Sequence, residues 1–224
     1  MSTILVIGAS RGIGREFARQ YAADGARVIA THRHPGDARS LREAGARPLQ
    51  LDVDSAESIA GLGWHLDGER VDVALLVAGI YGPRTSDLTP PSDEEFGAVM
   101  RTNLLAPMRL IPIVSQSVVA AHGKLAVISS LMGSIGMAKS TAGWLYRASK
   151  AGLNSVLKST SLELGAHGVV CVAFNPGWVR TDMGGAGADL DVRESVGSMR
   201  RVLGAINSSH NGKFLNYDGV QLEW

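Results

Sequence analysis

Near its N-terminus the chain carries the stretch Thr3-Ile-Leu-Val-Ile7-Gly8-Ala-Ser-Arg-Gly12-Ile-Gly14, which joins a short apolar run to three closely spaced glycines. The apolar run predicts a buried strand, and the pattern after the glycines predicts a helix. In such a turn, Gly8 allows a sharp bend, Gly12 lets a phosphate approach the backbone, and Gly14 lets the helix pack close to the strand. Because a helix N-terminus offers free N–H groups to an anion, the stretch favours nucleotide binding over a glycine-rich turn without a ligand.

Further apolar runs alternate with helical patterns along the rest of the chain. Strands are expected at residues 27–31, 46–51, 71–77, 123–130, 169–174 and 213–215. Helices are expected at residues 35–45, from the capping box Ser92-x-x-Glu95 to about residue 121 with an interruption near Pro107, from Tyr146 to about residue 167, and at residues 192–207. This alternation predicts an α/β fold with a parallel sheet.

Composition excludes several classes of protein. The chain has 224 residues, 45% of them hydrophobic, and its 22 basic and 21 acidic residues give a net charge of +1, so no global attraction to nucleic acid or membrane is expected. Cys171, the single cysteine, lies in an apolar run and is expected to be a buried, inert thiol. We expect no signal peptide, no membrane-spanning stretch and a cytoplasmic location. The six histidines show no metal-ligand spacing, and no metal site is expected.

The stretch Trp144-Leu-Tyr146-Arg-Ala-Ser-Lys150 carries the candidate chemistry. If it is helical, Tyr146 and Lys150 lie one turn apart on one face. A lysine ammonium at about 4 Å would lower the pKa of a tyrosine from about 10 to about 7, which suits general acid–base chemistry. Ser130, at the end of an expected strand, could hold a carbonyl oxygen as charge builds on it. The pair alone is weak, since an exposed tyrosine beside a solvated lysine is common.

Three motifs together resemble the short-chain dehydrogenase/reductase family. Gly8-Ala-Ser-Arg-Gly-Ile-Gly14 is similar to its cofactor motif, Tyr146-x-x-x-Lys150 to its catalytic motif, and Asn175-Pro-Gly-Trp-Val-Arg-Thr181 to a further signature. The gap between Ser130 and Tyr146 is 146 − 130 = 16 residues, longer than is usual in the family. A branch with C-factor-like and sniffer-like reductases has this longer loop followed by Tyr-Arg-x-Ser-Lys, and the resemblance to it covers the whole chain.

The resemblance implies one Rossmann-type doubly wound domain over residues 1–224, with seven parallel strands in the order 3-2-1-4-5-6-7 and helices on both faces. It also implies an oxidoreductase that interconverts a carbonyl and a secondary alcohol. Tyr146 would exchange the proton, and Lys150 would lower its pKa and bind the nicotinamide ribose. Ser130 would orient the carbonyl, and Asn103 would support a proton relay. Ser134 rivals Ser130, which is preferred because it directly follows the strand.

The cofactor expected is NADP(H), with NAD(H) as the less favoured alternative. After the second strand the chain has Thr31-His-Arg33-His, with no carboxylate to bind a ribose 2′-hydroxyl until Asp37, so Arg33 and Arg11 are placed to meet a 2′-phosphate. Asp52 would contact the adenine, or cap the next helix in competition with Asp54. The full set of expected cofactor-binding residues is Gly8, Ser10, Arg11, Gly12, Ile13, Gly14, Arg33, Asp52, Val53, Ala78, Gly79, Tyr146, Lys150, Pro176, Gly177, Val179 and Thr181.

Several points stay open on the sequence alone. Leu76-Val77 stands where the family has two asparagines, which concerns stability more than chemistry. Trp144 and Trp178 either line the pocket or pack against it. The pocket is expected to lie between loops at residues 80–91, 131–143 and 182–190, with a flexible lid at 184–187, and its small-molecule substrate is unnamed. A homodimer or homotetramer is expected, and no nucleic-acid or membrane partner. The rival function is a non-catalytic NADP(H)-binding sensor.

Overall fold

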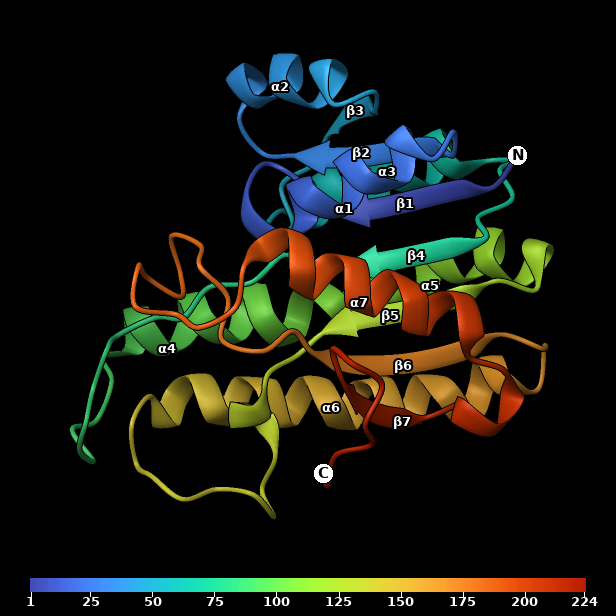
Figure 1. The fold of residues 1–224 in the computed structure, drawn as a ribbon. Coiled ribbons are helices and arrows are strands. Elements are labelled where there is room, and N and C mark those ends of the chain that lie inside the picture. The colour runs from blue at the N-terminus through green and yellow to red at the C-terminus, as the bar shows by residue number, and fades with distance from the viewer.

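One parallel sheet of seven strands forms the centre of the molecule. The computed structural model describes all residues, 1–224 (Figure 1). Neighbouring strands pair in the order β3-β2-β1-β4-β5-β6-β7, and every pairing is parallel, which confirms the predicted strand order. The strands are β1 (Thr3–Ile7), β2 (Arg27–His32), β3 (Arg47–Gln50), β4 (Val73–Leu76), β5 (Lys124–Ile128), β6 (Val170–Asn175) and β7 (Lys213–Asn216).

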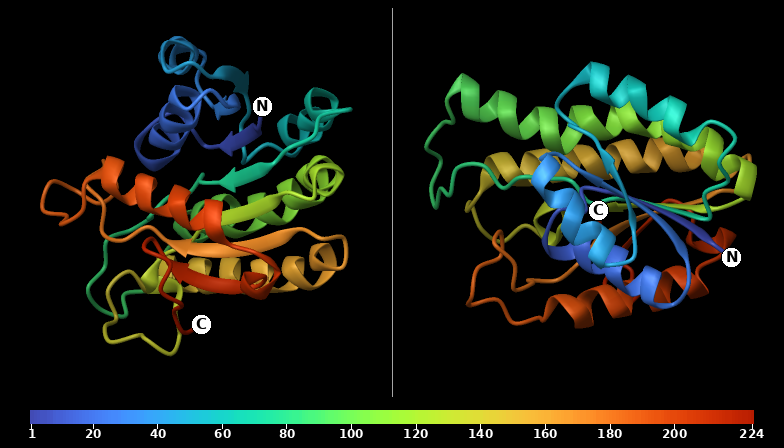
Figure 2. Two further views of the ribbon diagram at one scale, coloured as in Figure 1. Left: turned by 45° about the vertical axis from the view of Figure 1, so that its right-hand side comes forward. Right: turned by 90° about the horizontal axis from the view of Figure 1, so that it is seen from above.

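Helices cover both faces of the sheet, so that the domain has three layers (Figure 2). One face carries α1 (Gly12–Ala23), α2 (Ala38–Glu43) and α7 (Val192–Ala205). The other carries α3 (Ala56–Leu66), α5 (Ala106–Ala121) and α6 (Trp144–Gly165), with α4 (Asp93–Met100) leading into α5. Short 3₁₀ turns lie at Pro35–Asp37, Leu131–Gly133 and Ser208–His210.

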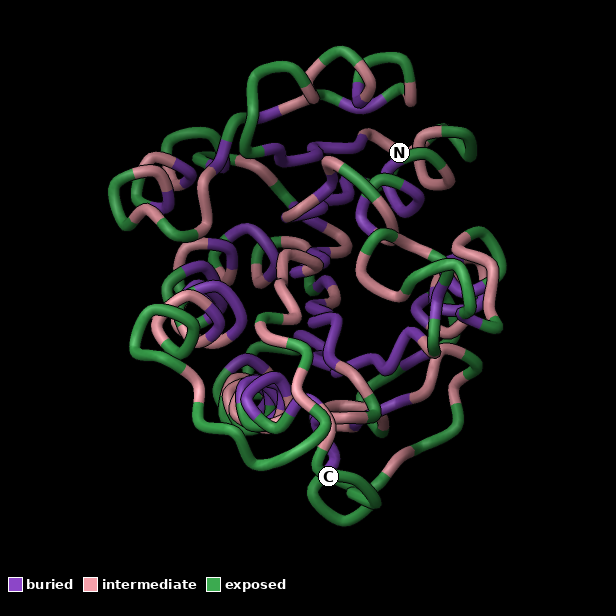
Figure 3. The backbone as a smooth tube through the Cα atoms, turned by 90° about the vertical axis from the view of Figure 1, so that its left-hand side faces the viewer, coloured by how far each residue is buried: buried purple, intermediate pink, exposed green.

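The core is aliphatic, as the low aromatic content requires. The inner strands β2, β1, β4, β5 and β6 are buried on both faces, and purple backbone follows the sheet through the middle of the molecule in Figure 3. Leu5 and Val127 point to the α3–α5–α6 side, whereas Val6 and Ala126 point to the α1–α7 side, which is the alternation that a strand imposes. Cys171 is buried and unpaired within the first of these clusters, as predicted.

The helical region after Ser92 is interrupted just before the expected position near Pro107. Ser92 and Glu95 form the predicted capping box at the start of α4. The irregularity is a π-helical turn at Arg101–Leu105, and Pro107 follows it at the start of α5. The interruption therefore centres on Asn103 rather than on the proline.

The same region partly corrects the expectation that the chain has no stretch able to span a membrane. The stretch Asp93–Ala121 is long and apolar enough, by length and composition alone, to cross a bilayer, and 39% of its most apolar window is buried. The apolar stretch was not recognised in the sequence because Arg101 and Arg109 interrupt it. Within the fold, Leu110, Val114 and Val118 of this stretch pack into the core. A core helix of a soluble protein can have the same length and apolar composition as a membrane-spanning helix.

Candidate active site

The first glycine turn has no room for side chains. Gly8 has a φ of +90°, and a Cβ there would lie 2.6 Å from the amide nitrogen of Ala78. A Cβ on Gly14 would collide with the carbonyl oxygen of Gly8, and a Cβ on Gly12, whose φ is +52°, would press on the Thr181 methyl at 3.3 Å. The three glycines thus bring the N-terminus of α1 against both β4 and the loop after β6, as a dinucleotide site requires.

Thr31 at the end of β2 fixes this turn, and sequence reasoning did not identify it. Its hydroxyl accepts a hydrogen bond from the Gly8 N–H at 2.9 Å, and its carbonyl oxygen accepts one from the Ala9 N–H at 2.8 Å. The side chain is 1% exposed. A buried threonine in a strand is ordinary in sequence terms, so only the three-dimensional pairing reveals its part.

Tyr146 and Lys150 lie one turn apart on α6, both buried, and face the carboxyl end of β5. Tyr146 is 7% exposed and Lys150 is 3% exposed. The Lys150 ammonium donates a hydrogen bond of 2.8 Å to the carbonyl oxygen of Ile128, and its Nζ lies 5.7 Å from the centre of the Tyr146 ring. Helical spacing predicted this shared face, and the buried lysine has one main-chain partner.

The pKa of Tyr146 differs from the expectation. Burial raises the pKa of Tyr146 to about 12, and interaction with the Ser130 hydroxyl opposes that rise in part. Lys150 does not lower it: the Lys150 nitrogen is hydrogen-bonded to the Ile128 carbonyl and lies 5.7 Å from the centre of the Tyr146 ring. The same burial lowers the pKa of Lys150 to about 8. The expected value near 7 assumed charge proximity and neglected desolvation.

The structure separates the two candidate serines. Ser130 follows β5, is partly exposed, accepts a hydrogen bond from the Met132 N–H at 3.1 Å, and interacts with the Tyr146 phenol. Ser134 is 2% exposed, and its hydroxyl donates to the carbonyl oxygen of Trp224 at 3.3 Å. Ser134 therefore holds the C-terminal segment, whereas Ser130 lies beside the phenol.

Asn103 occupies the π-helical turn and is fully buried. Its amide donates to the Ile80 carbonyl at 2.8 Å and to the Ser149 hydroxyl at 2.9 Å, and its oxygen accepts from the Ile80 N–H at 2.8 Å. A Cβ on Gly79 would lie 3.3 Å from the Asn103 oxygen and 3.4 Å from the Lys150 nitrogen. Gly79 is thus the point where Asn103 and Lys150 meet, beside the end of β4.

The residues expected at the adenosine end lie on the surface of the same edge. Arg33 is exposed, with its Nε donating to the His34 ring at 3.2 Å. Arg11 is also exposed and pairs with Asp182 at 3.3 Å. Asp52 is not the helix cap: its carboxylate accepts from the Asp54 N–H.

The cap of α3 is Ser55, which the sequence reasoning missed, and Asp54 instead accepts a hydrogen bond from the Thr102 hydroxyl at 2.8 Å. Val53 packs on the core. Where the family has two asparagines, Leu76 is buried, and the Val77 and Ala78 N–H groups both donate to the Ile7 carbonyl. The sheet is held there by main-chain bonds and aliphatic packing. The remaining turn residues, Ser10 and Ile13, are partly buried.

The loop after β6 approaches from the other side. The Pro176 carbonyl accepts from the Ser195 hydroxyl at 2.6 Å, and Gly177 has a φ of +81°. Val179 is 4% exposed, and the methyl of Thr181 faces Gly12. These four residues therefore lie at the carboxyl edge of the sheet, on the same side as the glycine turn.

Trp144 and Trp178, whose roles the sequence left undecided, each hold a loop in place through the indole N–H. The Trp144 indole N–H donates to the Thr89 carbonyl at 3.1 Å, and the Trp178 indole N–H donates to the Gly184 carbonyl at 2.9 Å. Trp178 keeps 57% of its surface exposed. The residue that does pack on Tyr146 is Tyr81, whose ring stacks on it with centroids 4.7 Å apart. Tyr81 was missed, although an aromatic residue two positions after Gly79 was the available signal.

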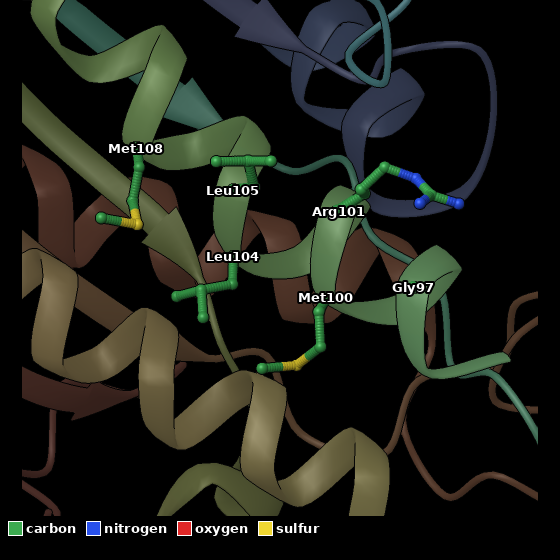
Figure 4. Close-up of a pocket in the computed structure, with 6 residues that line it drawn as sticks. All are labelled: Gly97, Met100, Arg101, Leu104, Leu105 and Met108. Carbon is green, nitrogen blue, oxygen red and sulfur yellow. The ribbon is translucent and has the colours of Figure 1, made fainter. Parts of the chain in front are cut away.

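A hollow in the surface lies beside α4 and α5. It has a volume of about 260 Å³ and is lined by residues of α4, the π turn and α5, with Met100 and Leu104 directed toward α6 (Figure 4). Leu104 also packs on Gly152 of α6. No three His, Cys, Asp or Glu side chains lie close enough together to hold a metal ion. The lining residues are Gly97, Met100, Arg101, Leu104, Leu105 and Met108.

Comparison with known proteins decides the family. Residues 2–189 match the model of the short chain dehydrogenase family. The chain belongs to the short-chain dehydrogenase/reductase family. The curated protein C-signal of Myxococcus xanthus is 35% identical over 161 residues, which cover 69% of this chain and 93% of that protein.

Solved structures agree over the full length of the chain. A short-chain dehydrogenase/reductase from Burkholderia multivorans with bound NADP has a TM-score of 0.90 and 32% identity, covering 100% of this chain and 99% of the other. The carbonyl reductase Sniffer of D. melanogaster has a TM-score of 0.90 and 27% identity, with 100% of both chains covered. The predicted branch, with C-factor-like and sniffer-like relatives, is confirmed, and this short-chain dehydrogenase/reductase is an NAD(P)-dependent oxidoreductase.

Proposed function

We propose that this protein uses NADP(H) to interconvert a carbonyl compound and a secondary alcohol, with Tyr146 as the proton donor and acceptor. The observation that carries the proposal is the convergence of Tyr146, Ser130, Lys150 and Asn103 at the carboxyl edge of the sheet, beside the side-chain-free Gly79. Ligands of open parallel sheets bind at this edge. The glycine turn and the start of α1 suit a pyrophosphate, and Gly79 suits a ribose.

In this proposal each side chain has one task. Bound NADP(H) supplies or accepts the hydride. The Ser130 hydroxyl holds the carbonyl oxygen, and the Tyr146 phenol gives that oxygen a proton during reduction. Lys150 binds the nicotinamide ribose, and its ammonium has main-chain support from Ile128. Asn103 holds the Ile80 main chain and so places the segment over which a proton relay to Lys150 would run.

The protonation state of Tyr146 favours reduction at neutral pH. With its pKa raised to about 12, the phenol is protonated and is ready to donate. Oxidation of an alcohol needs the phenolate, so we propose that the rate of oxidation gains from alkaline pH while reduction proceeds at neutral pH. An enzyme role is better supported than a sensor that binds NADP(H) without turnover, because the side chains that the chemistry needs are all present.

The test of this function is Tyr146→Phe. Loss of the phenol should lower the rate of NADPH-dependent reduction across a panel of aldehydes and ketones by about 10²–10⁴-fold, because that is the usual contribution of a general acid. NADPH oxidation measured by absorbance gives the rate, and fluorescence titration checks that NADPH still binds. Tyr21→Phe, on α1 where the ring stacks on Phe17, is the control and should keep full activity. Turnover unaffected by Tyr146→Phe would remove the assignment.

The cofactor preference is a second proposal with its own test. Arg33 has no acidic partner, and Arg11 is tied to Asp182, so Arg33→Gln should weaken NADPH by about tenfold and leave NADH nearly unchanged. Isothermal titration with both cofactors measures this, with Arg39→Gln on α2 as a control for loss of an exposed arginine. Equal losses for NADPH and NADH would contradict the preference.

Two further features of the proposal concern assembly and location. We propose a homodimer or homotetramer in which the apolar hollow around Met100, Leu104 and Met108 meets a second copy, since Met108 is 53% exposed and Leu162 of α6 is 72% exposed. We also place the protein in the cytoplasm, where a lone buried thiol such as Cys171 is ordinary.

A further inference from the structure

We propose that Arg84 determines substrate specificity, and that the preferred substrate is a carbonyl compound carrying a negatively charged group such as a carboxylate. The inference rests on the proposed function and extends it. Arg84 lies in the loop after β4, and its guanidinium carbon is 4.9 Å from the centre of the Tyr81 ring. Tyr81 in turn stacks on Tyr146 at 4.7 Å, so one aromatic ring separates this cation from the proposed proton donor.

The loop that carries Arg84 is held firmly against the start of α6. The Gly143 N–H donates to the Thr85 carbonyl at 2.9 Å, the Thr141 hydroxyl donates to the Ser86 carbonyl at 2.9 Å, and the Trp144 indole donates to Thr89. Gly143, with a φ of +62°, has no room for a Cβ because the Tyr81 hydroxyl occupies that place. The position of Tyr81 and Arg84 beside the active site is therefore built into the fold.

Arg84 is anchored but keeps most of its hydrogen-bonding capacity. Its Nη2 donates to the Met183 carbonyl at 2.7 Å, in the loop after β6, and the flat guanidinium lies over the Tyr81 ring. A guanidinium has five N–H donors, so several remain for a ligand in a fork that matches a carboxylate. Anchoring also lowers the entropy lost when a ligand binds.

The charge of Arg84 is not neutralised within the protein. None of the ion pairs in the structure includes it. The nearby carboxylates are engaged elsewhere: Asp182 pairs with Arg11, and Asp87 accepts a hydrogen bond from the Thr89 N–H at 2.9 Å. A cation fixed beside Tyr81 and Tyr146 without a carboxylate of its own attracts an anionic substituent of the substrate.

A simpler role for Arg84 would be to link the loops after β4 and β6 through Met183. Arg84→Gln separates the two roles, because it keeps an N–H donor for the carbonyl and removes the charge. Arg84→Lys restores the charge without the flat fork. Arg70→Gln is the matched control, since Arg70 is exposed just before β4 at the opposite edge of the sheet.

The experiment compares two matched substrates, 4-carboxybenzaldehyde and methyl 4-formylbenzoate, by NADPH consumption. The native enzyme should prefer the carboxylate in kcat/KM by about tenfold, Arg84→Gln should bring that ratio to about one while sparing the neutral ester, and Arg84→Lys should restore part of it. Arg70→Gln should behave as the native enzyme. An unchanged ratio in Arg84→Gln, or equal losses for both substrates, would overturn the specificity role.

A binding measurement keeps this inference separate from the proposed reaction. Benzoate, titrated against the NADP-loaded protein by tryptophan fluorescence, should bind about tenfold more weakly to Arg84→Gln than to the native protein. If no member of the aldehyde and ketone panel is reduced while benzoate binding still depends on Arg84, the proposed reaction fails and the anion site stands. Benzoate binding equal in both proteins would refute the anion site, whatever the turnover.

Discussion

The glycine turn at residues 8–14 and the Tyr146–Lys150 pair are the two regions with the strongest sequence motifs. They differ in how much of their behaviour those motifs predict. The turn has the shape that its glycines predict, since a Cβ on Gly14 would collide with the Gly8 carbonyl. The pair lies on one face as predicted, yet its charges behave differently, with the pKa of Tyr146 raised instead of lowered. Backbone geometry is encoded locally, whereas pKa depends on burial, which only the whole fold defines.

The largest effect that would sharpen this contrast is expected from Gly14→Ala. Because the new methyl group would meet main-chain atoms that have nowhere to move, the free energy of unfolding should fall by about 3 kcal/mol or more, which lowers Tm by at least roughly 6 °C, and NADPH binding should be lost. Thermal unfolding and cofactor titration measure both.

Gly61→Ala in α3 is the matched control for that substitution. Nothing lies within 4 Å of a Cβ at Gly61, so alanine should stabilise the helix by about 0.5–1 kcal/mol. Opposite signs at the two glycines would show that close approach, and not glycine content, gives the turn its importance. A Gly14→Ala protein with native stability and native NADPH affinity would contradict the conclusion that the glycines determine the shape of the turn.

A smaller effect is expected from the pH dependence of the buried pair. The folded-state pKa of Lys150 is lowered to about 8 from an unfolded value near 10.4, so between these pH values the unfolded chain binds more protons and stability rises with pH. The cost of burying the ammonium is therefore full below pH 8 and is relieved above it. From pH 7 to pH 9, native stability should rise relative to Lys150→Met by about 1 kcal/mol.

Urea unfolding of the cofactor-free proteins at pH 7 and pH 9 measures this difference. The range stops at pH 9 because burial also raises the pKa of the Cys171 thiol to about 12 and that of Tyr146 to about 12, and both groups lower stability as the pH rises further. A difference between native protein and Lys150→Met that stays constant over this range would show that Lys150 titrates normally and that its burial has no electrostatic consequence.

The sequence predicted the strands, their order and the residues at the sheet edge well, because apolar runs, glycines and helical spacing each reflect a local constraint. Strand ends were misplaced by one or two residues, as at β4, since the pattern does not show where hydrogen bonding to neighbours ends. The interruption lies at Arg101–Leu105, just before the position near Pro107 that the sequence indicated, because proline is a visible breaker and a π turn has no strong composition of its own.

The surroundings of Tyr146 were the least predictable part of the site. Tyr81 and Arg84 come from the loop after β4, Met183 from the loop after β6, and Gly143 from the start of α6. No spacing rule relates residues so far apart in the chain. Their meeting depends on three loops held by side-chain and main-chain hydrogen bonds, whose shapes follow from tertiary contacts and not from propensity.

The π-helical turn at Arg101–Leu105 has one more consequence, for the winding of the helix it interrupts. Such a turn accommodates an extra residue, so α5 is advanced by about 100° relative to an unbroken continuation of α4. Deleting one residue there would give a regular α-helix. The side chains of α5, including Met108, would then be rotated about the helix axis relative to Met100 and the rest of α4. The extra residue lets one continuous helix direct the Asn103 amide into the core while Met108 faces outward.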